Sequence, residues 1–154
     1  MSATLRPMRQ DEYDAWLPAA MDGYADDIER AGASAEAARQ KSERDFPALL
    51  PKGIETEGQW LYTVEADGEA VGSLWLAERE DDFGRTLFIY QVAIDAAQRG
   101  RGLGRAAMLL AEDEARRRGI SSVTLNVFGG NDVARNLYRS LDYSEAAVYM
   151  VKRV

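Results

Sequence analysis

Apolar side chains recur along this chain with two different spacings, and each spacing predicts one type of element. In residues 10–31 they stand three and four apart, which is the spacing of one helix face, and Pro18 predicts a break or kink in that helix. A second helix is expected to start at Ser34 and to run toward Leu50. Strands, with alternating or continuous apolar residues, are expected at 3–8, 60–66, 69–80 and 85–94.

The second half of the chain continues with strands and helices in turn. Asp67-Gly68, between two of the strands, is a strong signal for a tight β-hairpin. Apolar residues at helical spacing predict a helix over 102–118, ended by Gly119. A strand at 121–128, a helix after Asn131 and a final strand at 143–154 follow. The order β-α-α-β-β-β-α-β-α-β predicts an α/β fold of the α+β type, in which helices cover the faces of a mixed sheet.

Length and composition bound the class of protein. A chain of 154 residues suits one domain spanning 1–154 and suffices for a real core. Its hydrophobic fraction of 46% and charged fraction of 29% are those of a soluble globular protein. No apolar run approaches the ~18 residues of a membrane span. The first ten residues lack the apolar centre of a signal peptide, so we expect a cytoplasmic protein.

The residue types that are absent restrict the chemistry. Without Cys the chain has no disulfide and no thiolate nucleophile, and without His it lacks the commonest general base and metal ligand. We therefore expect no metal, and proton transfer by Asp, Glu, Tyr, Lys, backbone groups or water. The net charge of −7 argues against a nucleic-acid partner and favours a neutral or cationic substrate.

The most permissive backbone and the densest positive charge of the chain lie together in residues 99–105, Arg-Gly-Arg-Gly-Leu-Gly-Arg, between a strand and a helix. The first N–H groups of a helix have no partner within it, and the helix dipole adds partial positive charge there. Glycines let these groups approach a ligand, and arginine donors match phosphate oxygens. The segment predicts an anion site that suits a diphosphate, with a glycine-rich turn carrying solvated arginines as the alternative.

Two familiar phosphate loops do not fit this spacing. A Walker loop requires Lys and Ser/Thr after its second glycine, whereas Gly104 is followed by Arg105 and Ala106. A dinucleotide-binding loop of the form G-x-G-x-x-G that started at Gly100 would place its last glycine at Arg105. Both classes of nucleotide site are therefore disfavoured.

Two motifs resemble those of the GCN5-related N-acetyltransferase (GNAT) family. Arg99-x-x-Gly102-x-Gly104 is similar to the family signature [Q/R]-x-x-G-x-[G/A]. Residues 125–143, LNVFGGNDVARNLYRSLDY, resemble the second recurrent block L-x-V-x-x-x-N-x-x-A-x-x-L-Y-x-x-x-G-F, with Asp142 in place of glycine. The resemblance implies a mixed, mostly antiparallel sheet flanked by helices, and an N-acetyltransferase with acetyl-CoA (coenzyme A) as co-substrate.

The resemblance also implies a cofactor site. In such enzymes the strand before the turn pairs its backbone with the pantetheine arm, which carries over to Val92, Ala93 and Ile94; these residues equally suit a buried strand. Asn131 matches an asparagine that contacts the cofactor, or it serves only as an N-cap. The diphosphate would bind the turn, at Arg99, Gly100, Arg101, Gly102, Leu103, Gly104 and Arg105.

The implied reaction is direct attack of a primary amine on the thioester in a ternary complex. Tyr138 matches a tyrosine near the CoA sulfur, where a phenol can protonate the leaving thiolate; a core aromatic is the alternative. Relatives often place a carboxylate near the positions of Tyr90 and Gln91. Glu78 on the neighbouring strand, acting through water, is the candidate base, and a carboxylate in the turn at 81–82 could serve in the same way; a surface residue is the alternative for Glu78.

The acceptor is expected to bind to residues 22–58 and to the turn at 79–85. Tyr24 and Asp27, with Tyr90, are candidates for holding the cationic amine of a small molecule or a peptide N-terminus; a solvated acidic helix face is the alternative. Rival functions are a non-catalytic acyl-CoA-binding module and a nucleotide binder. The aromatic residues of the predicted last strand could pair two subunits as a homodimer.

Overall fold

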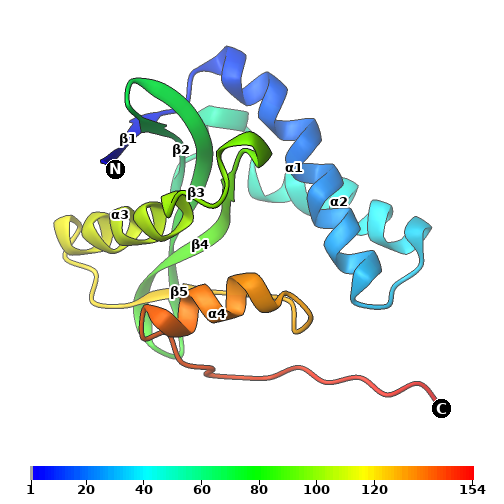
Figure 1. Ribbon diagram of the computed structural model, residues 1–154. Helices are drawn as coiled ribbons and strands as arrows, with labels where there is room; N and C mark the ends of the chain where they lie inside the picture. Colours follow the sequence, from blue (N-terminus) through cyan, green and yellow to red (C-terminus); the bar gives the residue numbers. More distant parts are fainter. Residues whose placement is uncertain (1) are drawn as a thin grey trace.

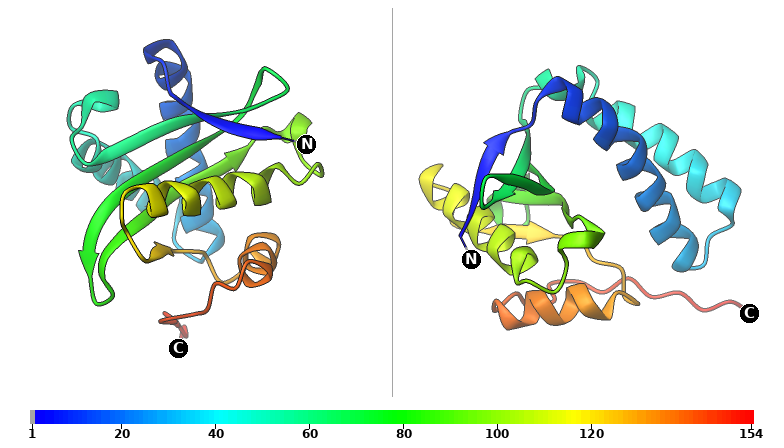
Figure 2. Two further views of the ribbon diagram at one scale, coloured as in Figure 1. Left: turned by 90° about the vertical axis from the view of Figure 1, so that its left-hand side faces the viewer. Right: turned by 45° about the horizontal axis from the view of Figure 1, so that its top comes forward.

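The computed structural model describes residues 2–154, in which four α-helices surround a five-stranded sheet (Figures 1 and 2). The strands are β1 (Ala3–Pro7), β2 (Gln59–Ala66), β3 (Glu69–Asp81), β4 (Gly84–Ile94) and β5 (Val123–Leu125). The α-helices are α1 (Gln10–Arg30), α2 (Ala35–Leu49), α3 (Leu103–Arg117) and α4 (Asp132–Ser140). Short 3-10 helices lie at η1 (Gly53–Glu55) and η2 (Ala96–Gln98).

The sheet is mixed, as the sequence predicts. Its strands lie in the order β1-β2-β3-β4-β5, with antiparallel pairing from β1 to β4 and parallel pairing between β4 and β5. The helices α1 and α2 lie on one face of the sheet, and α3 and α4 lie on the other (Figure 2).

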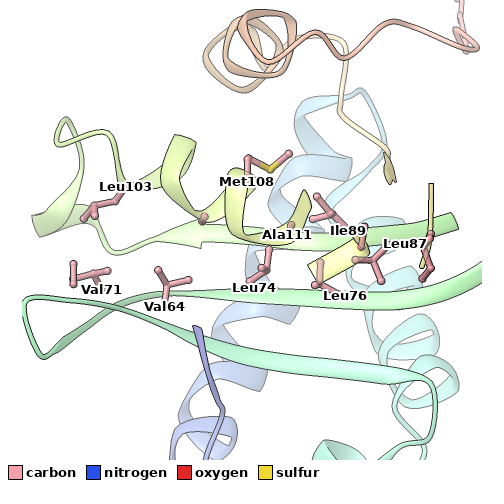
Figure 3. Packing of buried hydrophobic residues seen from close by; sticks show 13 residues of the cluster. Val64, Val71, Leu74, Leu76, Leu87, Ile89, Leu103, Met108 and Ala111 are labelled. Atoms are coloured by element: carbon pink, nitrogen blue, oxygen red, sulfur yellow. The ribbon is translucent and has the colours of Figure 1, made fainter. Parts of the chain in front are cut away.

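The larger core lies between α3 and the sheet (Figure 3). Because successive strand residues point to opposite faces, Leu74 and Leu76 of β3 both face α3 and are fully buried. Burial of one such side chain stabilises a fold by about 1.5–3 kcal/mol. The stripe of α3 that packs on them repeats at three and four residues, and consists of Leu103, Ala107, Met108, Ala111 and Ala115.

A second, aromatic core lies on the opposite face, under α1 and α2. Trp75, which falls between the two leucines of β3, points to this side. Its ring centroid lies 5.6 Å from that of Trp16 on α1 and 5.6 Å from that of Phe46 on α2. The two helices are thereby fixed to the sheet by ring contacts.

Turns and caps form where local sequence signals predict them. Asp67 and Gly68 have φ values of 53° and 79°, as a two-residue hairpin turn requires. The Ser34 hydroxyl accepts a hydrogen bond from the Ala37 amide and caps α2. Gly119 ends α3 at φ 68°, and the Ile120 amide donates to the carbonyl of Ala115.

Three sequence-based expectations were wrong. Of the break or kink expected at Pro18, the break does not occur: α1 runs from Gln10 to Arg30, because its packing outweighs a lost backbone bond that costs about 3 kcal/mol. The strand expected at 121–128 shrinks to Val123–Leu125. The final strand expected at 143–154 does not form, because these residues pair with no strand of the described chain. They are exposed from Glu145 onward, and Glu145 itself forms ion pairs with Arg135 and Arg139.

Candidate functional site

An irregularity in β4 lies where its pairing with the edge strand β5 ends. Trp75 pairs with Gln91 and Leu76 pairs with Ile89, so Tyr90 is an extra residue on β4, a β-bulge. The parallel pairing of β4 with β5 ends at the same point, with Ile89 opposite Leu125. Because a bulge bends its strand, β4 leaves β5 beyond this point, and Tyr90–Ile94 have no β5 partner.

The three residues expected to pair with a pantetheine arm lie on this separated part of β4. Val92, Ala93 and Ile94 pair with β3 on one edge, and their other edge points to where β5 has diverged. Val92 and Ile94 pack against the core beside α3. Backbone groups on the β5 side of a strand in this position can pair with an extended ligand, except the Ile94 carbonyl, which accepts a hydrogen bond from Arg99.

The glycine-arginine turn lies at the end of β4 and begins α3. Gly100 and Gly102 have φ values of 78° and 76°, a conformation that strains any residue with a Cβ. The first helical bond of α3 runs from the Ala106 amide to the Gly102 carbonyl, so the amides of residues 103–105 precede it. No atom lies within 4 Å of a Cβ built on Gly100 or Gly102, so the space in front of both is open.

The three arginines of the turn already have protein partners. Arg99 donates to the Ile94 carbonyl at 3.1 Å, and Arg105 donates to the Ser140 hydroxyl at 3.0 Å. Arg101 bonds to Gln98, and its guanidinium lies 3.8 Å from the Asp67 carboxylate. Their side chains connect the turn to β4, to α4 and to the β2–β3 hairpin. The amides at the start of α3 are the remaining hydrogen-bond donors of the turn.

The second motif forms α4, which lies beside this turn. Asn131 caps the helix by accepting a hydrogen bond from the Ala134 amide at 3.2 Å, so its N-cap role is confirmed. Leu137 contacts the N-terminal turn of α3, 3.6 Å from a Cβ built on Gly104. Asp142 adopts the left-handed conformation at φ 67° and ends α4 as the usual family glycine would.

Tyr138 faces inward from α4. Its ring packs against the core beside α3, 6.0 Å from the ring of Tyr143. Burial raises the pKa of Tyr138 above the ordinary value of a phenol, so the hydroxyl stays protonated at neutral pH. A protonated, partly buried phenol next to the opening of the sheet can donate a hydrogen bond or a proton.

The opposite side of the bulge carries a polar group that the sequence analysis noted only as a departure from the family pattern. The Gln91 side-chain oxygen accepts hydrogen bonds from the Trp16 indole at 2.8 Å and from the Ser73 hydroxyl at 3.1 Å. The neighbouring Tyr90 stacks on Trp75 with ring centroids 4.6 Å apart. Trp16 lies 75 positions before Gln91, so no spacing in the sequence reveals the contact.

The expected acceptor residues are brought together in part. Tyr24 packs on Phe46, and through Phe46 and Trp75 it belongs to the same aromatic cluster as Tyr90. Its hydroxyl donates to Asp45 at 3.2 Å, and burial raises its pKa. Asp27 instead forms an exposed ion pair of 2.7 Å with Arg30 of the same helix.

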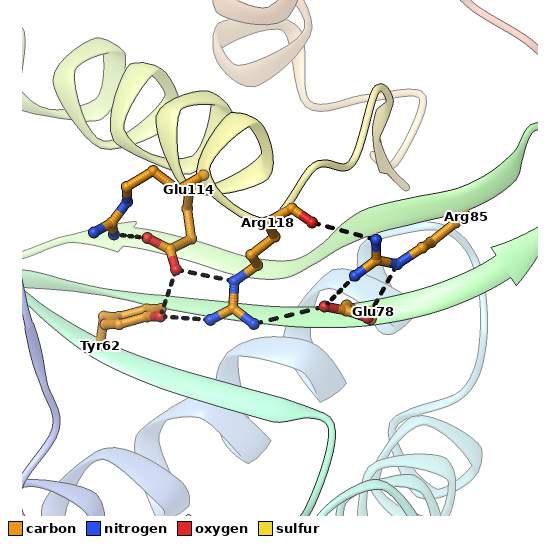
Figure 4. A network of polar contacts seen from close by, with 6 residues as sticks. Tyr62, Glu78, Arg85, Glu114 and Arg118 are labelled. Atoms are coloured by element: carbon orange, nitrogen blue, oxygen red, sulfur yellow. Dashed lines mark hydrogen bonds and ion pairs between the residues drawn. The ribbon is translucent and has the colours of Figure 1, made fainter.

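Glu78 belongs to an ion-pair network at the other end of α3 (Figure 4). Its carboxylate accepts hydrogen bonds from Arg85 at 3.0 and 3.3 Å and lies 3.7 Å from Arg118. Arg118 also bonds to Glu114 at 2.9 Å and to the Tyr62 hydroxyl at 3.2 Å. Fifteen helical residues span about 22 Å, so this network and the glycine-arginine turn lie at opposite ends of α3.

Two further searches of residues 2–154 gave negative results. The carboxylates there form no group of three or more that could hold a metal ion. None of the helices in this part of the chain has both the length and the apolar character needed to cross a membrane.

Comparison with known proteins shows which family this chain resembles in sequence and fold. The acetyltransferase (GNAT) family profile matches residues 11–143. The uncharacterized N-acetyltransferase YycN of Bacillus subtilis (strain 168) is 31% identical over the full length of both chains. The crystal structure of B. subtilis YycN superposes with a TM-score of 0.93 at 30% identity, over 99% of each chain.

Two more distant similarities are informative. The mycothiol acetyltransferase of Beutenbergia cavernae is 32% identical over 90% of this chain, but this chain spans only 43% of that protein. The aminoglycoside N-acetyltransferase AAC(6')-Iy, solved in complex with CoA, has a TM-score of 0.66 at 14% identity and shares the fold.

Proposed function

Because the chain belongs to the GNAT family of N-acetyltransferases, which use acetyl-CoA, we propose that it transfers the acetyl group to a primary amine by direct attack within a ternary complex. One observation carries the proposal. Beyond the bulge β4 separates from β5, and the N-terminus of α3 follows the end of this separated part of β4. The separated part of β4 is followed in the chain by the turn that begins α3, an order that supports a long ligand ending in a diphosphate.

In this proposal the diphosphate binds the amides of residues 99–105. No atom lies within 4 Å of a Cβ built on Gly100 or Gly102, so this side of the turn is open, and the dipole of α3 favours the negative charge. The pantetheine arm lies along Val92, Ala93 and Ile94, and Asn131 contacts the cofactor while it caps α4. The backbone thus supplies most donors, and the arginines hold the turn in shape.

The chemical step joins the amine nitrogen to the acetyl carbon and breaks the carbon–sulfur bond. Tyr138 donates its phenolic proton to the departing thiolate, since a phenol carries its proton at neutral pH and Tyr138 lies on α4, which packs against the start of α3. The attacking nitrogen loses a proton to solvent as the amide forms, and the tyrosinate regains one from solvent. Holding both reactants in one site supplies much of the rate.

The amine reaches the thioester from the α1–α2 side, where Tyr90 and Gln91 sit at the bulge. Tyr24 and Asp27 lie on the same side and would contact a small amine or a peptide N-terminus. Gln91 cannot accept the ammonium proton, so water carries it away. Both oxygens of Glu78 face Arg85, and we assign Glu78 to the ion-pair network rather than to catalysis.

A thermal-shift titration tests the binding part of the proposal. Ligand at 100 times its dissociation constant adds about 2.7 kcal/mol to stability, which is easily detected. We expect acetyl-CoA and CoA to raise the melting temperature and NAD and ATP to leave it unchanged; no shift with CoA contradicts the cofactor site. Thiol release across a panel of amines then tests turnover, and CoA binding without release from any amine indicates a binding module.

A further inference from the structure

Arg79 is an arginine whose hydrogen-bond donors have no acceptor in the described part of the chain. Each of the other arginines in residues 2–154 has an oxygen partner, in a carboxylate, a carbonyl, a hydroxyl or an amide. Arg79 has neither a hydrogen bond nor an ion pair within these residues, and its cation lies over two aromatic rings instead. Its guanidinium carbon is 4.3 Å from the ring centroid of Phe88 and 5.9 Å from that of Tyr90. The five N–H groups of this guanidinium are therefore available to a ligand.

The guanidinium lies on the side of the sheet from which the acceptor amine is proposed to arrive. Alternate residues of a strand share a face, so Arg79 lies on the same face of β3 as Trp75, which belongs to the aromatic core on the α1–α2 side. Tyr90, the extra residue of the β-bulge, contacts both: its ring stacks on Trp75 with centroids 4.6 Å apart and lies under Arg79. A group bound by Arg79 is thus next to the bulge at which the amine is proposed to meet the thioester.

Gln91 also presents donors at the bulge. An indole N–H can only donate, so the bond from Trp16 turns the Gln91 oxygen toward α1 and its amide nitrogen away from it. That oxygen accepts from Ser73 as well, whereas the nitrogen has no hydrogen-bond partner in residues 2–154. None of the buried side-chain nitrogens and oxygens in this part of the chain lacks a partner, so the Gln91 nitrogen is accessible. Two side chains at the bulge therefore hold unused donors.

The aspartates noted on α1 and α2 are already paired. Asp45 on α2 is bonded to Lys41 at 2.8 Å, and Asp27 on α1 is bonded to Arg30 at 2.7 Å. Because the charges of these aspartates are balanced and that of Arg79 is not, Arg79 favours a ligand that carries a negative group.

We propose that the acceptor is a small molecule with a carboxylate or a phosphate a few bonds from its primary amine, and that Arg79 binds this anionic group. This rests on the proposed function, because it names the acceptor class of the same transfer reaction. Arginine suits the role, since its planar fork of donors can bond two oxygens of one anion at once. The rings of Phe88 and Tyr90 hold the guanidinium in place, so less of its freedom is lost when the acceptor binds.

The first test uses pairs of amines that differ in the anionic group: glycine and glycinamide, β-alanine and β-alaninamide, 2-aminoethyl phosphate and ethanolamine. Comparing variant with wild type on the same amine cancels differences in amine basicity. We expect Arg79→Gln to lower kcat/KM for the anionic member about 10- to 100-fold more than for the neutral member, the range of a charge-assisted hydrogen bond. The pair that shows this loss identifies carboxylate or phosphate as the bound group. An equal loss for both members of every reactive pair overturns the proposal.

Two further variants separate anion binding from a structural role of Arg79. Arg79→Lys retains the charge without the fork, so it should recover part of the preference for the anionic member. Arg116→Gln removes an exposed positive charge from α3, on the other face of the sheet, and should retain the full preference. A loss of preference in Arg116→Gln as large as that in Arg79→Gln indicates an effect of net charge alone and contradicts a site at Arg79.

A binding measurement distinguishes a failure of this proposal from a failure of the transfer reaction. N-acetyl-β-alanine and its neutral amide are titrated with CoA present, and binding is read from tryptophan fluorescence, because Trp75 stacks on Tyr90. We expect the acid to bind the wild type about 10-fold or more tightly than the amide does, and Arg79→Gln to bind both equally. This preference without thiol release from any amine contradicts the transfer reaction and supports the anion site. Thiol release without this preference overturns the role of Arg79 and leaves the transfer reaction standing.

Discussion

Gly72→Ala is the substitution for which the structure predicts the clearest effect. Gly72 lies in β3 opposite Ile94, and a Cβ built on it falls 2.2 Å from the carbonyl oxygen of Ala93 and 3.0 Å from the Ile94 side chain. Real Cβ atoms essentially never approach closer than 3.0 Å, so the backbone of β4 has to move by at least about 0.8 Å. The obstacle is backbone, so no change of side-chain rotamer relieves it.

The magnitude follows from the cost of overpacking. Extra methyl groups in a well-packed region cost about 1–3 kcal/mol, and for a chain of this length each kcal/mol lowers the melting temperature by about 2–4 °C. We therefore expect Gly72→Ala to melt about 2–12 °C below the wild type. Since the displaced carbonyl belongs to the segment proposed to bind the pantetheine arm, the affinity for CoA should fall as well.

The assay is thermal unfolding by circular dichroism, with a CoA titration of the same samples. Gly23→Ala is the matched control, because it adds the same methyl group in the interior of α1 with no atom within 4 Å. Ala exceeds Gly in helix propensity by about 1 kcal/mol, so this control should stabilise the protein. If Gly72→Ala is as stable as the wild type and binds CoA equally well, the argument from the close approach of β3 and β4 is refuted.

Three further predictions address the site and the ion pairs. Tyr138→Phe should lower the rate of thiol release by about 10²-fold or more while the thermal shift with CoA is retained, and an unchanged rate removes Tyr138 from the acid role. Glu78→Gln should leave that rate within about twofold and lower the melting temperature slightly, because an ion pair at a partly exposed site contributes about 0–1 kcal/mol; a large loss of rate restores Glu78 as the base. Hydrogen bonds from Arg6 lower the pKa of Glu12 to about 2, so its stabilising effect is present above the ordinary pKa of 4.5 and is lost as the pH falls toward 2. Melting curves of Glu12→Gln should lie below those of the wild type at pH 7 and approach them near pH 2, and a constant difference contradicts the assignment.

Features that depend on a few neighbouring residues were predicted from the sequence alone. The Asp67-Gly68 turn, the Ser34 and Asn131 caps and the left-handed end at Gly119 all formed as expected. Each is decided by the chemistry of one residue and of backbone groups within a few positions of it. The helix α3 was predicted for the same reason, since the spacing of its apolar residues lies within one segment of the sequence.

Features that join distant parts of the chain were decided only by the tertiary structure. The bulge at Tyr90 depends on how β4 meets β3, and the Gln91 contact with Trp16 spans 75 positions. The sequence does not tell whether the carboxylate of Glu78 faces an acceptor or the guanidinium groups of Arg85 and Arg118. The packing of α3 against β3 decides which of these it contacts.

The C-terminal segment shows the same division most plainly. The composition of residues 146–151 favours a strand, so the prediction of a strand at 143–154 had a sound basis. A strand exists only when its backbone hydrogen bonds are made, and composition does not say which edge makes them. The position of α4 and the ion pairs of Glu145 direct this segment past its own sheet. The edge with which a strand pairs depends on where whole elements lie, and those elements are far apart in the sequence.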